Sequence, residues 1–119
     1  MLNSLEITKI AAKALDDKLA NDIIVLETRD VTVLADYFII CTANNPPHIK
    51  NLSDEVERLL EEKGEPVLHH EGYRSGGWVL LDYGCVIVHL FTKENRQFYS
   101  LERLWGDAPQ IDLDKLLAE

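Results

Sequence analysis

The sequence predicts an α/β (α+β) fold, in which a mixed β-sheet of about five strands is flanked by helices. Short apolar runs rich in β-branched or aromatic residues predict the strands, and apolar stripes at helical spacing predict the helices. These elements follow the order α-β-β-α-β-β-β-α. The helix between the second and third strands allows a crossover connection, so a sheet with parallel and antiparallel neighbours is expected.

The first helix is expected over residues 3–19, where apolar residues recur every three or four positions. Asn3 followed by Glu6 has the spacing of a capping box, with Asn in place of the usual Ser or Thr. A short apolar strand, DIIVLE, is predicted next at 22–27. The helical stripe consists of Ile7, Ile10, Ala11, Ala14 and Leu15.

The second strand is expected at 37–42, YFIICT, and the sequence NNPP at 44–47 predicts a loop. Proline lacks an amide hydrogen and restricts the residue before it, which disfavours regular structure there. A second amphipathic helix should follow and end near Gly64, because glycine is a common terminator just past a helix. Its apolar stripe is Ile49, Leu52, Val56, Leu59 and Leu60.

The chain is organised around residues 71–91, where two apolar runs at 78–83 and 85–91 are separated by Gly84. Each run is too short for a free-standing helix, so paired strands are predicted. A third strand at 67–71 should precede them, with a turn at Gly76-Gly77. The two faces of these strands are both mostly apolar, as expected of a sheet covered on both sides.

Alternation along the first of these runs places Trp78, Leu80 and Asp82 on one face of the sheet. Val79, Leu81 and Tyr83 should lie on the other face. In the second run, Cys85, Ile87, His89 and Phe91 separate in the same way from Val86, Val88 and Leu90.

The last helix is expected at 92–104, capped by Thr92, with Phe98, Leu101 and Trp105 on its inner side. The tail at 106–119 carries Pro109 and sparse leucines, and it could either dock as an arm or fray. We therefore expect one domain spanning 1–119, with a core at 3–105 and a C-terminal tail.

Composition narrows the class of protein. The 119 residues suffice for one core, and no apolar stretch approaches the ~20 residues that span a bilayer. The N-terminus lacks the pattern of a secretory or transit sequence, so a cytoplasmic protein is expected. The net charge of −9 argues against sequence-independent binding to nucleic acid, which requires basic residues to neutralise phosphates. It could steer the domain toward a basic partner or serve only solubility.

Metal, redox and cofactor chemistry have little support in the sequence. Cys41 and Cys85 are predicted to be reduced thiols inside strands, because they lie far apart and form no C-x-x-C motif. The neighbours His69 and His70 point to opposite faces of a strand, and His89 stands alone among aliphatic residues. We therefore expect no metal and no cofactor, and His89 is predicted to be a core or rim histidine whose ring nitrogens are satisfied by hydrogen bonds.

Catalytic chemistry also has little support. Asp36, Asp82, Asp107 and Glu71 lie near the ends of predicted elements, but no two carboxylates share one face of a strand as a two-metal site requires. A phosphate-binding glycine loop and a G-x-S-x-G turn are both absent. The aromatic residues Trp78 and Tyr83 are better candidates, because such side chains are enriched in binding hot spots, although a strand tryptophan is more often core.

The chain resembles the Iojap/YbeB proteins, the ribosomal silencing factor (RsfS) family. The resemblance extends through almost the whole sequence in the correct order. The matching segments are LADYFIICT at 34–42, HIK at 48–50, DEV at 54–56, EGY at 71–73, WVLLDYG at 78–84, VIVHLF at 86–91 and FYSLERLWGDAP at 98–109.

The resemblance implies a non-catalytic regulator with a nucleotidyltransferase-like fold that lacks the active-site carboxylates. Family members bind the large-subunit protein L-fourteen, block joining of the small subunit, repress translation when nutrients are scarce, and form homodimers. The family's binding surface falls on Trp78 and Tyr83 here, and we add Leu80 and Phe91 because they share strand faces with Trp78 and His89.

Two departures from the family pattern concern this surface and a nearby loop. The family usually has a Gly-Thr-Ser-like loop after the ICT strand, whereas this chain has ANNPP at 43–47. The position after Gly84, commonly acidic in the family, is Cys85. The second change removes a charge close to the expected contact surface.

Two other classes of function stay open from the sequence. One is an enzyme acting on nucleotides through Asp36, Asp82 or Asp107. The other is a plain dimerisation module, in which an exposed strand edge pairs with a second copy.

Overall fold

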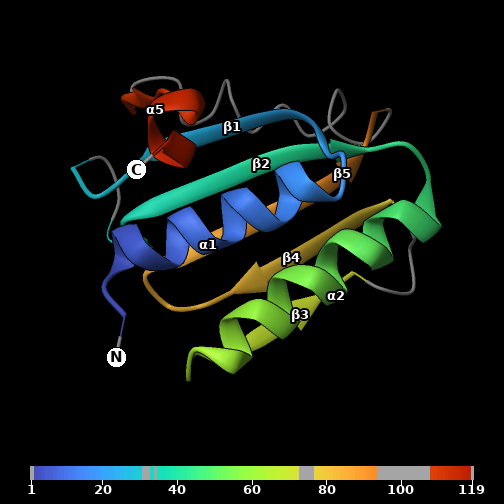
Figure 1. Ribbon diagram of the computed structural model, residues 1–119, viewed down its shortest axis with the longest axis horizontal. Coiled ribbons are helices and arrows are strands. Elements are labelled where there is room, and N and C mark those ends of the chain that lie inside the picture. The colour runs from blue at the N-terminus through green and yellow to red at the C-terminus, as the bar shows by residue number, and fades with distance from the viewer. Residues whose placement is uncertain (1, 31–32, 34, 73–76, 94–107, 119) are drawn as a thin grey trace.

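The computed structural model describes residues 2–30, 33, 35–72, 77–93 and 108–118. Across these residues the chain forms one six-stranded sheet, with helices packed against it (Figure 1). The elements are α1 (Ser4–Asp17), β1 (Asn21–Glu27), β2 (Tyr37–Ala43), α2 (Pro46–Glu62), β3 (His69–Glu71), β4 (Trp78–Asp82), β5 (Val86–Thr92), β6 (Gln110–Ile111) and α5 (Leu113–Ala118).

The sheet is mixed, as predicted, and its strand order is β3-β4-β5-β2-β1-β6. The central strands β2 and β5 run parallel, in a register that places Tyr37 beside Val86 and Ala43 beside Thr92. Each of the other neighbouring pairs is antiparallel. This arrangement confirms the predicted fold class, with β6 as one strand more than expected.

Helices α1 and α2 lie side by side on one face of the sheet (Figure 1). The predicted capping box is present: Asn3 Oδ1 accepts from the Glu6 amide at 2.8 Å, and Glu6 Oε1 accepts from the Asn3 amide at 3.0 Å. Both helices bury their apolar stripes against aliphatic residues of the strands. No helix within the described residues is long and apolar enough to cross a membrane.

The prediction of a loop at 44–47 is wrong for its second half, because α2 begins at Pro46. Proline fits the first positions of a helix, where an amide hydrogen has no partner within the helix. Asn45 caps the helix through Oδ1, which accepts from the His48 amide at 2.9 Å. The double proline therefore starts the helix. At the other end, Gly64 follows with φ +84°, as expected of a terminator.

The tail docks. Strand β6 pairs with β1, and Leu116 of α5 is buried in the same core cluster as α1 and α2. Figure 1 shows α5 beside β1, at the edge of the sheet remote from β3. The predicted helix at 92–104 falls almost wholly outside the described residues, as does its inner stripe of Phe98, Leu101 and Trp105.

The hairpin between β4 and β5 forms around Gly84, at φ +84°. Asp82 Oδ1 accepts from the Gly84 amide at 2.7 Å, which closes the turn. Cys85 lies in this turn, so its prediction as a strand residue is wrong, whereas Cys41 does lie in β2. Neither cysteine forms a disulfide. Strand β3 is shorter than predicted, and the expected turn at Gly76 is outside the described residues.

Candidate partner-binding surface

Strand β4 places its side chains alternately on the two faces of the sheet, as predicted. Val79 and Leu81 are buried in the core beneath the helices, at 1% and 0% exposure. Trp78 and Leu80 point to the opposite face and are half-buried. We call this half-buried pair and its supporting rings the aromatic face; it consists of Phe38, Trp78, Leu80, His89 and Phe91.

The rings of the aromatic face are packed in a regular way. Trp78 lies parallel to Phe91, its cross-strand partner, with ring centroids 5.8 Å apart and planes 10° apart. His89 is nearly parallel to both, 6.3 Å from Trp78 and 6.1 Å from Phe91. Phe38 of β2 meets the edge of His89 at 5.3 Å. Three adjacent strands thus fix the orientation of the indole.

Burial divides the predicted contact residues into two groups. Trp78 and Leu80 retain exposed surface, whereas Phe91 is only 1% exposed and supports the indole from within the sheet. Tyr83 is 7% exposed and belongs to the core cluster on the helix side. The structure therefore brings Trp78, Leu80 and Phe91 together and places Tyr83 on the other face, because odd and even positions of β4 diverge.

His89 contributes to this face in a way that the sequence did not reveal. It is 6% exposed, which confirms a core histidine. The prediction that its ring is satisfied by hydrogen bonds is wrong, because neither ring nitrogen has a partner among the described residues. Burial lowers the pKa of His89 to about 4, so the imidazole is neutral at physiological pH. It is an uncharged ring that packs beside both Trp78 and Phe91.

Gly72 is a second feature that sequence reasoning missed. It adopts φ +96°, and a Cβ placed there would lie 1.8 Å from the Trp78 carbonyl oxygen. Only glycine therefore allows the chain to pass so close to the start of β4. The signal in the sequence is the glycine of the EGY segment, directly after β3.

The rim of the aromatic face is polar. Glu71 of the edge strand β3 lies opposite Leu80, and its carboxylate is 2.7 Å from His69 Nε2. Both side chains are exposed, whereas the exposed His70 between them pairs with Leu81 and belongs to the helix side of the sheet. An apolar centre with a polar, solvent-exposed border is common in protein-binding surfaces.

The carboxylates considered for catalysis are not assembled into a site. Asp82 Oδ1 accepts from the Gly84 amide, and the Glu71 carboxylate lies 2.7 Å from His69 Nε2. Asp36 lies directly before β2. Asp107 is outside the described residues. The part of the chain that the structure describes contains no group of three or more metal-ligating side chains. Burial raises the pKa of the Cys85 thiol, which disfavours the reactive thiolate.

Comparison with known proteins identifies the family. Residues 2–119 match the family described as "Ribosomal silencing factor during starvation". The chain is 44% identical over 113 residues to ribosomal silencing factor RsfS of Bacillus subtilis, covering 95% of this chain and 96% of the relative. It is 35% identical over 117 residues to RsfS of Halalkalibacterium halodurans, covering 98% and 100%.

Solved structures agree with these relationships. A crystal structure of a Chromobacterium violaceum protein superimposes with a TM-score of 0.85 at 38% identity, covering 88% of each chain. A Bacillus halodurans protein gives a TM-score of 0.80 at 34% identity, covering 90% of this chain and 97% of that one. Sequence match and fold together place this chain in the ribosomal silencing factor family.

Proposed function

We propose that this protein represses translation under nutrient limitation by binding the large ribosomal subunit and blocking its union with the small subunit. The relatives in B. subtilis and H. halodurans carry the name ribosomal silencing factor, which supports a ribosomal role. The proposed docking partner is the large-subunit protein L-fourteen, and the protein acts as a regulator without catalysis.

The observation that carries this proposal is the half-buried pair Trp78 and Leu80 on the aromatic face. A preordered tryptophan loses little conformational freedom on binding and contributes a large contact area. The parallel stacking against His89 and Phe91 supplies that order. Leu80 extends the apolar centre along the same face of β4.

Charge supports the same partner class. The net charge of −9 and the exposed Glu71 at the rim favour approach to a basic protein, because complementary charge accelerates encounter. Once docked, the domain itself would exclude the small subunit sterically. Tyr83, buried on the helix side of the sheet, would then act indirectly, by supporting the β4–β5 turn.

We further propose a cytoplasmic location and a homodimer in the free state. The docking role and the dimer can be separated by experiment, because the edge strand β3 and the aromatic face carry different side chains. If the dimer formed through β3, changing its exposed His70 would alter oligomeric state and leave ribosome binding intact.

Co-sedimentation with purified subunits tests the proposed function. Wild-type protein should pellet with large subunits and stay in the supernatant with small ones. Leu80→Glu should abolish pelleting, because the charge would be desolvated at the apolar centre of the interface. Leu5→Glu is the matched control: Leu5 is 38% exposed on α1, and an acidic residue in the first turn of a helix is tolerated.

The control variant should bind as the wild type does. Equal pelleting of wild type and Leu80→Glu would refute the aromatic face as the contact, and pelleting with small subunits would refute the proposed partner.

A further inference from the structure

The imidazole of His89 is buried without the hydrogen bonds that its nitrogens can make. It is 6% exposed, and within the residues that the structure describes neither Nδ1 nor Nε2 has a partner. A buried polar atom without a hydrogen bond makes the folded state less stable, because it has given up its bonds to water. Such atoms are uncommon in native proteins, and each one calls for an explanation.

Packing alone does not explain a histidine at this position. The ring lies nearly parallel to Trp78 and Phe91, and it meets Phe38 edge-on. A phenylalanine ring could make the same contacts and would leave no nitrogen unpaired. Residues that conflict with their surroundings in this way are expected at functional sites. The mismatch at His89 therefore points to a role for its ring nitrogens.

The position of His89 connects it to the exposed part of the aromatic face. Leu80 lies directly opposite it across the β4–β5 pair, and Ile87 precedes it by two residues on the same face. Both aliphatic side chains are half-buried. By contrast, Ile40, opposite His89 on β2, and Phe91 are only 0% and 1% exposed. The imidazole is therefore nearest to solvent on the side of Leu80 and Ile87.

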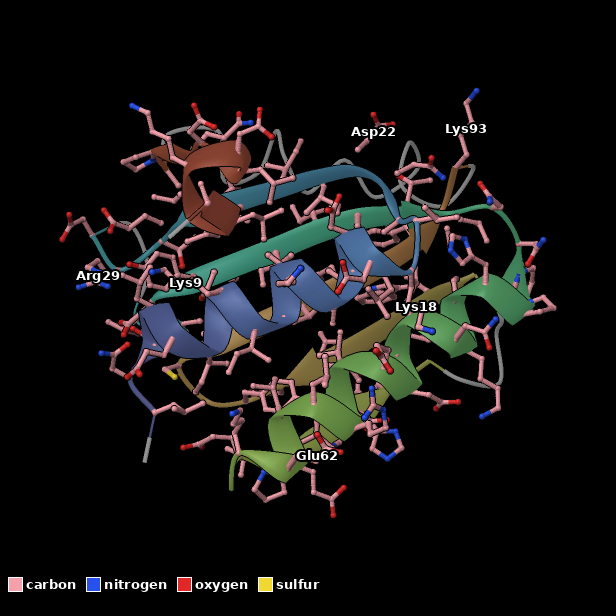
Figure 2. The ribbon with its side chains drawn as sticks, in the orientation of Figure 1. Lys9, Lys18, Asp22, Arg29, Glu62 and Lys93 are labelled. Atoms are coloured by element: carbon pink, nitrogen blue, oxygen red, sulfur yellow. The ribbon has the colours of Figure 1, made fainter. Side chains whose placement is uncertain are left out.

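The surroundings of His89 favour an uncharged partner group. Burial lowers the pKa of His89 to about 4, so the imidazole is neutral and offers one donor and one acceptor. A cation would lose its hydration here and bond only to a neutral nitrogen. Figure 2 shows Lys18 and Glu62 at the ends of α1 and α2, the helices on the other face, so the sheet separates these charges from His89. A hydroxyl or a carboxamide both donates and accepts, and it therefore matches either tautomer of the ring.

We propose that His89 is a specificity-determining contact for the large subunit, in which a ring nitrogen hydrogen-bonds an uncharged hydroxyl or carboxamide side chain of the docking protein. The Leu80 side chain turns aside as the partner docks, a rotamer change of a kind that is common at interfaces. The new bond satisfies a nitrogen that is unpaired in the free protein, so a partner with a polar group at this point is favoured over one with an apolar group. The contact requires docking on the large subunit, so it rests on the proposed function.

Co-sedimentation titration with purified large subunits compares wild type with His89→Phe, which keeps an aromatic ring and removes both nitrogens. His89→Phe should bind about tenfold more weakly, the loss expected for one hydrogen bond. Its urea midpoint at neutral pH should equal or exceed that of the wild type, because the unpaired nitrogens are gone. His70→Phe, at an exposed position on the helix side, is the control and should bind as the wild type does.

The outcomes separate the two proposals. If wild type does not pellet with large subunits, the proposed function and the His89 contact are both refuted. If wild type pellets and folded His89→Phe binds equally well, the His89 contact alone is overturned.

NMR of the wild-type protein decides the question if His89→Phe does not fold. The imidazole nitrogens of His89 are isotopically labelled and observed in the complex with the purified docking protein, L-fourteen. A hydrogen bond to an uncharged group should shift the resonance of one ring nitrogen while the imidazole stays neutral. Unchanged resonances in the complex, or protonation of both nitrogens by a partner carboxylate, would overturn the proposal.

Discussion

Val88 and Leu90 project from β5 toward the helices, and His89 between them projects to the other side of the sheet. The helix side is closed by aliphatic side chains that are fully buried, as Val88 and Leu90 are at 0% exposure. The opposite side carries parallel rings and keeps Trp78 half-exposed. One face therefore holds the fold together, and the other orients a side chain for a partner.

The largest expected effect is a loss of stability when the helix side of the sheet is changed, with no change in binding by the aromatic face. Leu90→Ala removes a fully buried side chain from the helix side and should lower the free energy of unfolding by about 2–5 kcal/mol. The measurement is urea denaturation. Where the variant is still folded, its affinity for large subunits should match that of the wild type. Loss of binding by folded Leu90→Ala would mean that the faces are not functionally separate.

The aromatic face should make stability depend on pH through His89. The pKa of His89 falls from 6.5 to about 4 on folding, so the unfolded chain binds a proton that the folded chain does not across that window. Above pH 6.5 the imidazole is neutral in both states, so it does not reduce the free energy of unfolding. As the pH falls from 6.5 to the folded pKa, protonation of the unfolded chain lowers the free energy of unfolding by about 3 kcal/mol.

The comparison of wild type with His89→Leu isolates this contribution. The free energies of unfolding of the two proteins should diverge with pH between 4 and 6.5, with the wild type losing more on acidification. The exposed His70→Leu is the control and should retain the pH dependence of the wild type. Parallel pH profiles for wild type and His89→Leu would show that the imidazole is not buried in its neutral form.

Gly72 tests whether the start of β4 is held by a close backbone contact. Gly72→Ala should cost about 2 kcal/mol or more, because it combines a left-handed backbone with a clash against the Trp78 carbonyl. Gly64→Ala is the matched control, since Gly64 has φ +84° but open space around a Cβ. A larger loss of stability and of large-subunit binding in Gly72→Ala than in Gly64→Ala is expected. Equal losses of stability in the two variants would show that the positive φ alone causes them, and that the close contact with the Trp78 carbonyl contributes nothing.

The smallest expected effect concerns the N-terminal cap of α2, one of the two helices that cover the helix side of the sheet. Asn45→Ala removes the cap on the His48 amide and should lower stability by about 1 kcal/mol, without changing the aromatic face. Thermal denaturation and large-subunit binding measure the two consequences. A loss of binding in the folded variant would couple the two faces.

Much of the fold could be predicted because its signals are local. The alternation of Trp78 and Leu80 with Val79 and Leu81 follows from strand geometry, and the capping box at Asn3 follows from spacing. The start of α2 was missed because proline signals both loops and first helical turns. Strand β6 is only two residues long, so pairing with β1 defines it, and no local pattern could indicate it.

The candidate surface could be predicted only in part, because its packing also depends on pairing between strands. The sequence singles out Trp78, and periodicity places Leu80 beside it. The packing of His89 beside Trp78 and Phe91 depends on the cross-strand register of β4 and β5, which the sequence leaves open. The same register places Phe91 beside the indole on the neighbouring strand, so residue type alone could not distinguish a contact from its support.

The most direct test is the association of purified large and small subunits in a sucrose gradient, with increasing protein. Wild type should shift full ribosomes to free subunits, and Trp78→Ala should require at least about thirtyfold more protein for the same shift, the loss expected for a binding hot spot. Circular dichroism confirms that the variant is folded. Undisturbed ribosomes in excess wild-type protein, or equal potency of folded Trp78→Ala, would contradict a steric block that depends on the aromatic face.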